Sequence, residues 1–430
     1  MQDNLELRAR NIIKDLDGAS GLVSRLEAIY EQNSYAREIT RHLTVNDKAY
    51  GRERLERRKR LQKDLMPERM TKLFPENFAD EKFLLEGLEI KHFSVGGKKR
   101  DYLAVDLSAS VLKALTINLC LMIPVPRLSQ ESISLVTELA KNDRLSKSER
   151  FESLVKLLWN DDKDRKVPLV LYMEERGVDS RNLLMELCDS KNSRGSAFLS
   201  QAANTIGTNP FTKLDGKTSA RREDVSKQVL SEADKTELLE FFTQAMEAGY
   251  TFMIPERLSS ARRADMQGKT PSEMNQRLNS FGLNLIGLEI REILTLLEQV
   301  EKFIPCLSSP FIVGHRESAL IASYIAAIEP RISACYNSEG FYDFCAAIKS
   351  SEILVNMSVP KLLRDFSMQD ILALIAPRPL FLNNIKKALE RDDAKDLYYR
   401  DETEYREKID NLREVYASYD ALDNLETELD

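Results

Sequence analysis

Histidine is scarce in this sequence: its 430 residues include only His42, His92 and His315. Most nucleophilic hydrolases use histidine as the proton carrier, because its pKa lies near the operating pH. The count also excludes a metal site built from several histidines. The scarcity therefore narrows the hydrolase mechanisms open to the chain, and we expect neither a metal nor a cofactor.

Cysteines are few and scattered, and long apolar runs are missing. The five cysteines are odd in number and have no CxxC spacing (Cys120, Cys188, Cys306, Cys335 and Cys345). This pattern indicates free buried thiols in a reducing cytoplasm rather than disulfides or zinc. No run of about 18 apolar residues is present, and the N-terminus lacks the layout of a signal peptide. We therefore predict a cytoplasmic protein with no membrane association.

The overall composition is that of a soluble globular protein. Hydrophobic residues make up 43% of the chain and charged residues 30%, and the net charge is −7. A chain of this length can bury a large core. The mild negative charge argues against general nucleic-acid binding. The stretch YGRERLERRKRLQKDL forms a basic helical face, but acidic residues interrupt it, which favours a solvated face over a nucleic-acid patch.

The chain divides into a helical N-terminal extension, residues 1–86, and an α/β domain, residues 87–430. Apolar residues recur at helical spacing in the first part, and strands alternate with helical patterns in the second. The predicted strands cover 88–95, 101–107, 114–126, 166–174, 249–256, 308–314, 331–340 and 378–384. The helical patterns cover 234–249, 282–303, 318–329 and 367–376. This alternation predicts a mostly parallel sheet flanked by helices.

Two polar segments interrupt this pattern, at about 188–224 and 257–277. Both are rich in small polar or basic residues, and loops of this length are usually functional lids or mobile linkers. We expect both to be insertions above the carboxyl ends of the strands.

Several segments, in this order, resemble the acetyl-xylan-esterase and dienelactone-hydrolase-like branch of the α/β-hydrolase superfamily. They include AGYTFMIPE, the predicted helix 282–303, IVGHRESALIASYIAAIEPRISA and DILALIAPRPLFLNN. The resemblance covers most of the chain from about residue 50. It implies an α/β-hydrolase-like fold with a helical N-terminal extension and a shortened C-terminus.

The elbow that the resemblance identifies has lost its nucleophile. The family pattern is G-x-S-x-G, in which the serine occupies a strained turn. Here the pattern reads Gly314-His315-Arg316-Glu317-Ser318. Arginine stays protonated and offers no usable lone pair, so Arg316 cannot form an acyl-enzyme. Ser318 comes two positions late, where elbow geometry points it elsewhere.

The other parts of the hydrolase machinery are also missing from the positions that the resemblance implies. The acid expected after the APRPL strand falls near Ala388, and the histidine expected after DNLE is absent. The oxyanion segment reads Met-Glu-Glu-Arg-Gly over 173–177, where two carboxylates would repel a developing negative charge. Ester hydrolysis is therefore not expected.

Charged residues are instead predicted to gather at the carboxyl ends of the strands, where open α/β sheets bind ligands. The candidates are Glu174, Glu175, Arg176, Arg257, His315, Arg316 and Glu317. One interpretation is a salt-bridged plug in a pseudoenzyme that binds a protein partner or itself, with Glu174 or Glu175 beside Arg316. A second is a binding site for a small anionic ligand. A third is a non-hydrolytic lyase, isomerase or cyclase with Glu174, Arg316 and Glu317 as catalytic residues.

Overall fold

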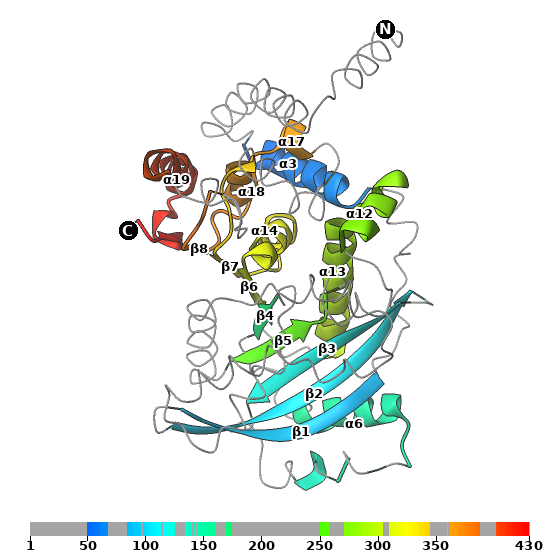
Figure 1. The fold of residues 1–430 in the computed structure, drawn as a ribbon. Helices are drawn as coiled ribbons and strands as arrows, with labels where there is room; N and C mark the ends of the chain where they lie inside the picture. Colours follow the sequence, from blue (N-terminus) through cyan, green and yellow to red (C-terminus); the bar gives the residue numbers. More distant parts are fainter. Residues whose placement is uncertain are drawn as a thin grey trace, which may run out of the picture.

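The computed structural model describes fifteen stretches of the chain. These are residues 50–67, 84–95, 98–112, 115–124, 134–136, 138–139, 142, 144–159, 169–173, 250–257, 271–303, 309–344, 359, 362–387 and 401–429. They contain one sheet and the helices that cover it (Figure 1).

The sheet has nine strands in the order β1-β2-β3-β5-β4-β6-β7-β8-β9. The strands are β1 (Leu84–Val95), β2 (Lys98–Leu112), β3 (Leu115–Pro124), β4 (Leu169–Tyr172), β5 (Thr251–Pro255), β6 (Phe311–His315), β7 (Ala334–Ser338), β8 (Leu380–Asn383) and β9 (Leu425–Thr427). The pairs from β1 to β5 are antiparallel, and every pair from β5 onward is parallel. The predicted α/β-hydrolase-like architecture is confirmed.

Helices lie along the whole length of the sheet (Figure 1). They are α3 (Tyr50–Leu65), α6 (Lys147–Trp159), α12 (Pro271–Ser280), α13 (Leu285–Phe303), α14 (Glu317–Ile328), α17 (Leu362–Asp365), α18 (Met368–Ala373) and α19 (Glu402–Ala417). Helix α6 packs on the β1 end, α14 packs on β6 and β7, and α19 lies near the β8–β9 end.

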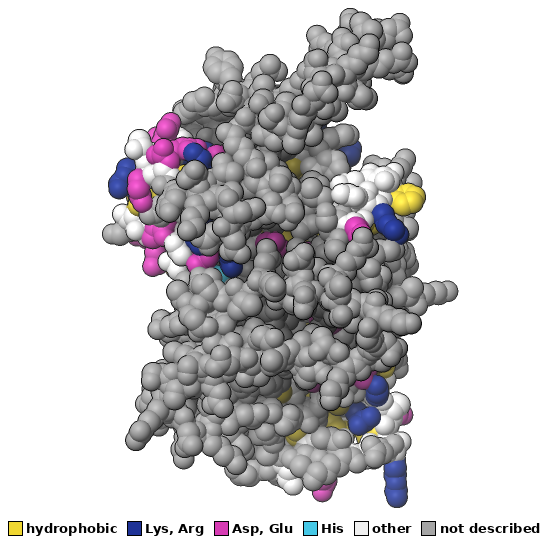
Figure 2. All heavy atoms as spheres, in the orientation of Figure 1, with side chains coloured by type: hydrophobic (Ala, Val, Ile, Leu, Met, Phe, Trp, Pro, Cys, Tyr) yellow, Lys and Arg dark blue, Asp and Glu magenta, His cyan; other side chains and the backbone are white. Residues whose placement is uncertain are grey.

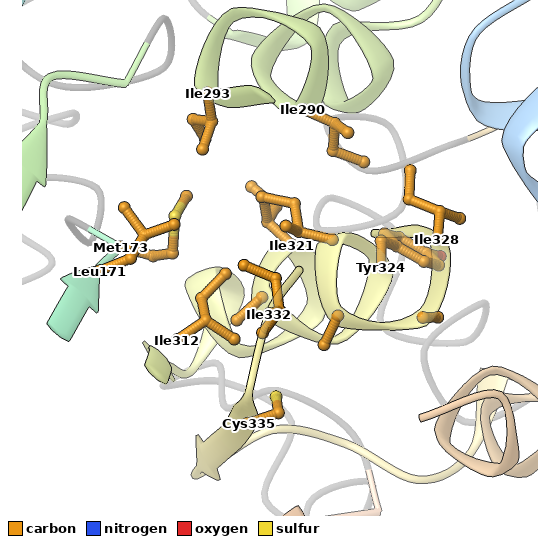
Figure 3. Packing of buried hydrophobic residues seen from close by; sticks show 14 of the residues in the cluster. Leu171, Met173, Ile290, Ile293, Ile312, Ile321, Tyr324, Ile328, Ile332 and Cys335 are labelled. Carbon is orange, nitrogen blue, oxygen red and sulfur yellow. The ribbon is translucent and has the colours of Figure 1, made fainter. Parts of the chain in front are cut away.

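Helix α14 lies inside the core, and all its residues from Ser318 to Ile328 are buried. A helix that is apolar all round belongs inside a protein rather than at its surface. Ile290 and Ile293 of α13 face Ile321 of α14, while Leu171 and Ile312 approach from the strands (Figure 3). Each such side chain contributes about 1.5–3 kcal/mol by leaving water. This packing fixes the strand–turn–helix unit that begins at β6.

Helix α3 is built into this core. Leu61 and Leu65 have no exposed surface, and the Asn284 side-chain amide donates to the Leu65 carbonyl at 3.0 Å. A Cβ at Gly287 would lie 1.9 Å from that carbonyl oxygen, so only glycine allows this close approach. The Arg57 guanidinium lies 3.1 Å from the buried Asp370 carboxylate.

The basic stretch is therefore solvated on only one side. Lys59 and Arg60 are exposed, as predicted for a solvated face, whereas Arg57 is buried in its ion pair. The predicted helical extension, residues 1–86, also overlaps the sheet at its C-terminal end. Strand β1 begins at Leu84, so residues 84–86 are strand and not helix.

Strand β9 is one of the elements that the sequence patterns do not predict, as are α6, α12, α17 and α19. Leu425–Thr427 pairs in parallel with β8. Three residues are too short for a periodic pattern, so the strand leaves little trace in the sequence. The predicted helix 234–249 and the predicted insertion 188–224 lie outside the described residues. Of the predicted insertion 257–277, the structure describes Arg257 and the first part of α12.

Candidate functional site

Strand β6 ends in a strained turn with the backbone shape of a nucleophile elbow. Arg316 has φ 51° and ψ −115°, and its backbone N–H donates to the Ser338 carbonyl at 2.8 Å. Helix α14 starts at the next residue, Glu317. A Cβ at Gly314 would lie 2.4 Å from the Ser318 carbonyl oxygen, so glycine is required there. The predicted elbow is present, and an arginine occupies its central position.

The residues after three neighbouring strands share this unusual backbone. The parallel register aligns His315 with Ser338, and Ser338 with Asn383. The following residues, Arg316, Glu339 and Asn384, have φ values of 51°, 50° and 49°. Positive φ costs a non-glycine residue on the order of 1 kcal/mol or more, and such residues gather at functional sites. The three residues therefore form a row at the carboxyl edge of the sheet.

Glu339 is the centre of a charge network at this edge. Its carboxylate accepts hydrogen bonds from Lys386 Nζ and from Asn384 Nδ2, both at 3.0 Å. Arg316 Nε lies 3.8 Å from Glu339 Oε2. The Glu339 side chain is only 3% exposed, while those of Lys386 and Arg316 are each 20% exposed. A buried carboxylate thus lies under two partly exposed cations, as burial of a charge requires.

His315 is buried beside this network. Its Nε2 atom lies 4.0 Å from Glu339 Oε2, and its side chain is 4% exposed. The site thus brings together three kinds of side-chain group that the sequence predicts near the elbow. They are an imidazole, a guanidinium and a carboxylate.

Arg257 lies in a separate buried contact. Its Nη1 donates to Ser318 Oγ at 2.7 Å, and its Nη2 lies 3.0 Å from Glu289 Oε2. All three side chains are buried. A guanidinium cannot accept a proton from a hydroxyl group, so the contact with Arg257 does not activate Ser318 as a nucleophile. The structure gives Arg257, a predicted ligand-binding residue, an ion pair inside the core.

Helix α19 is linked to the same edge through Lys387. Lys387 Nζ and Lys408 Nζ each lie 2.7 Å from the Glu404 carboxylate. Burial raises the pKa of Glu404, but hydrogen bonds from the two lysines outweigh this effect and hold the pKa below its usual value. Figure 2 shows acidic and basic side chains interspersed over α19, at the upper left. The loop that carries Lys386 is therefore anchored on both sides.

Three predicted site residues, Glu174, Glu175 and Arg176, lie outside the described residues, so the predicted pairing of Arg316 with one of these glutamates stays a prediction. The carboxylate that the structure sets beside Arg316 is Glu339. Glu317 is half-buried at the start of α14.

Glu339, Asn384 and Lys386 are not among the residues predicted for the site. A signal for them does exist, because each lies at or just after the carboxyl end of a predicted strand, in YNSEG or in FLNNIKK. The carboxyl ends of adjacent parallel strands meet at one edge of a sheet. Only the register, however, shows that Glu339 and Asn384 stand level with Arg316.

Within the described ranges, no group of three or more His, Cys, Asp or Glu side chains is arranged to hold a metal ion. In the same part of the chain, no helix has both the length and the apolarity needed to cross a membrane.

No protein-family model matches this chain, and no curated protein matches it. Similar solved structures are esterases. A structure titled as a putative acetyl xylan esterase from Bacteroides fragilis is 13% identical, with a TM-score of 0.46, over 87% of this chain and 75% of that one. A glucuronoyl esterase from Solibacter usitatus is 12% identical, with a TM-score of 0.43, over 87% and 82%. Acetyl xylan esterase 1 from Thermoanaerobacterium is 10% identical, with a TM-score of 0.37, over 84% and 93%.

The strand order and the elbow of this chain carry the assignment of the fold. Activity depends on the residues of the site, since one fold supports many chemistries.

Proposed function

We propose that this chain is a non-hydrolytic α/β-hydrolase-like protein that acts by binding a partner or a ligand. The observation that carries the proposal is the row Arg316, Glu339 and Asn384, which places a charge network at the elbow instead of a nucleophile. A serine hydrolase needs a hydroxyl at this position, and a guanidinium that stays protonated cannot replace it.

The surroundings of the elbow support the same conclusion. An oxyanion hole works by presenting neutral donors to a developing negative charge. Here the Glu339 carboxylate lies beside the elbow residue and already accepts two hydrogen bonds. A developing oxyanion next to it would be repelled. The nearest hydroxyl in the elbow pattern, on Ser318, is buried and accepts a hydrogen bond from Arg257.

The network is better suited to holding a fixed arrangement than to turnover. Lys386, Asn384 and Arg316 surround one buried carboxylate, and three positive-φ residues present these groups at the edge of the sheet. Charges held in such a fixed arrangement can recognise a complementary surface or an anionic group. A binding role therefore accounts for a fixed charge network at the carboxyl ends of these strands without a catalytic nucleophile.

The first test is hydrolysis of short-chain aryl esters by the purified chain, with Arg316→Ala as the matched control. We expect no turnover by the wild-type chain above this control. Turnover that exceeds the control and disappears in Glu339→Gln would overturn the proposal, because the network would then be catalytic.

The second test is native mass spectrometry of the same protein. We expect an added mass, from a retained ligand or from a second copy of the chain, that is reduced in Glu339→Gln. A bare monomer in both proteins across the working concentration range would argue against a binding role for this edge.

A further inference from the structure

Three arginines meet where α3 crosses the ends of two other helices, away from the elbow in sequence. Arg54 Nη2 and Arg58 Nη2 both donate to the carbonyl of Leu374, at 2.7 Å and 3.0 Å. Leu374 is the C-terminal cap of α18. Arg378 follows four residues later, and its Nε donates to the carbonyl of Ile375, the residue after Leu374, at 3.2 Å. The three guanidiniums therefore gather around the end of α18.

Arg378 is oriented by the end of α14. Its Nη1 donates to the carbonyls of Glu329 and Ile332, at 3.0 Å and 2.7 Å, and its Nη2 donates to the carbonyl of Ala326. The C-terminal carbonyls of a helix carry partial negative charge, so these contacts favour a cation. They do not supply a full counter-charge.

Two arginines of the cluster lack an acidic partner. Neither Arg58 nor Arg378 forms an ion pair within the described part of the chain. Glu329 attracts Arg58, but its carboxylate is held by Arg331 through Nε and Nη2, both at 2.9 Å. Burial, followed by repulsion from Arg58 and Arg54, lowers the pKa of Arg378 to about 10.

Arg58 also has an unused donor. Its Nε atom is buried and has no hydrogen-bond partner among the residues that the structure describes. Buried donors normally have a partner, so each exception calls for an explanation. Asp370, the acid paired with the preceding arginine of α3, is already engaged by Arg57 and by Ser367. An acceptor with several oxygen atoms would satisfy the donor and the excess charge together.

We propose that this cluster binds a phosphate group, held by Arg58 and Arg54 with Arg378 as electrostatic support. Guanidinium groups bind phosphate through paired, charge-assisted hydrogen bonds, and a dianion offers enough acceptors for more than one arginine. The site is independent of the elbow network, since it uses α3 and the ends of α14 and α18.

The test is isothermal titration calorimetry of the full chain with inorganic phosphate. The ionic strength is kept constant with chloride as the balancing ion. We expect saturable binding at one site. Arg58→Met should weaken phosphate binding by about tenfold or more, because the paired N–H donors of one guanidinium are lost. Arg60→Met, on the exposed side of the same helix, should change it by less than about twofold, because it removes only a distant, screened charge.

Three outcomes would overturn the proposal: no saturable binding, equal binding by Arg58→Met, or equal losses in Arg58→Met and Arg60→Met. Acetate is titrated in parallel. If it binds as tightly as phosphate, the site is a general carboxylate site and the assignment is wrong. Circular dichroism checks that Arg58→Met is folded. If it is not, Arg58→Lys is used instead. This variant keeps the charge but lacks the paired N–H donors of the guanidinium group, so we expect weaker phosphate binding for it too.

Discussion

Replacing Glu339 with glutamine tests whether the charge network holds the elbow edge together. Glutamine keeps the size of the side chain. It removes the negative charge that lies 3.0 Å from Lys386 Nζ and 3.8 Å from Arg316 Nε. The change therefore separates the electrostatic contribution from packing.

The expected cost follows from the burial of the three charges. Breaking a fully buried ion pair costs about 3–5 kcal/mol, whereas an exposed pair contributes about 0–1 kcal/mol. Glu339 is 3% exposed and both cations are 20% exposed, so the network lies nearer the buried limit. We expect the free energy of unfolding to fall by about 2–4 kcal/mol in Glu339→Gln. The coupling should be about 1–2 kcal/mol with Lys386 and below about 1 kcal/mol with Arg316, because the second distance is longer.

Urea unfolding of the single and double variants measures these quantities directly. The set is Glu339→Gln, Lys386→Met, Arg316→Met and the two double variants that contain Glu339→Gln. Glu426→Gln, an exposed glutamate on β9, is the matched control and should stay within about 0.5 kcal/mol of wild type. If Glu339→Gln behaves like this control, or if both couplings are zero, the charges form a solvated surface and the reasoning fails.

Two further changes test contacts away from the elbow. Arg57→Met leaves the buried Asp370 carboxylate without its guanidinium, so urea melts should show a loss of about 3 kcal/mol; an equal loss in the exposed Arg60→Met would contradict this. Glu404→Gln should lower the free energy of unfolding at pH 7 by less than about 1 kcal/mol, because the lysine-bonded carboxylate is partly exposed. Because the pKa of Glu404 is lower in the folded than in the unfolded state, its stabilising effect is fully present above the unfolded pKa of about 4.3 and declines as the pH falls through the folded pKa. A difference between wild type and variant that does not shrink as the pH is lowered would show that the effect is not electrostatic.

The parallel strands could be predicted because they are buried on both faces. Leu169–Tyr172 and Thr251–Pro255 are continuous apolar runs in the sequence and are fully buried in the sheet. The first two strands were equally clear, since Gly96 and Gly97 separate two β-rich runs. Strand β9 failed this test because Leu425–Thr427 alternates buried and exposed residues over only three positions.

The candidate site could be predicted only in part, for a different physical reason. The identity of Arg316 at the elbow follows from the local pattern around Gly314. Its neighbour Glu339 is 23 positions away along the chain, and nothing local to it signals a contact with Arg316. The contact depends on the alignment of β6 with β7, which burial of the whole sheet determines.

Backbone strain and the charge network at this edge support each other. A positive φ at Glu339 persists only if surrounding contacts outweigh its cost, and the Glu339 N–H donates to the Asn383 carbonyl at 3.0 Å. The same conformation brings the carboxylate within reach of Asn384 and Lys386. Weakening the network should therefore release strain as well as charge. For this reason the measured cost of Glu339→Gln is expected to fall below the cost of breaking a fully buried ion pair in an unstrained backbone.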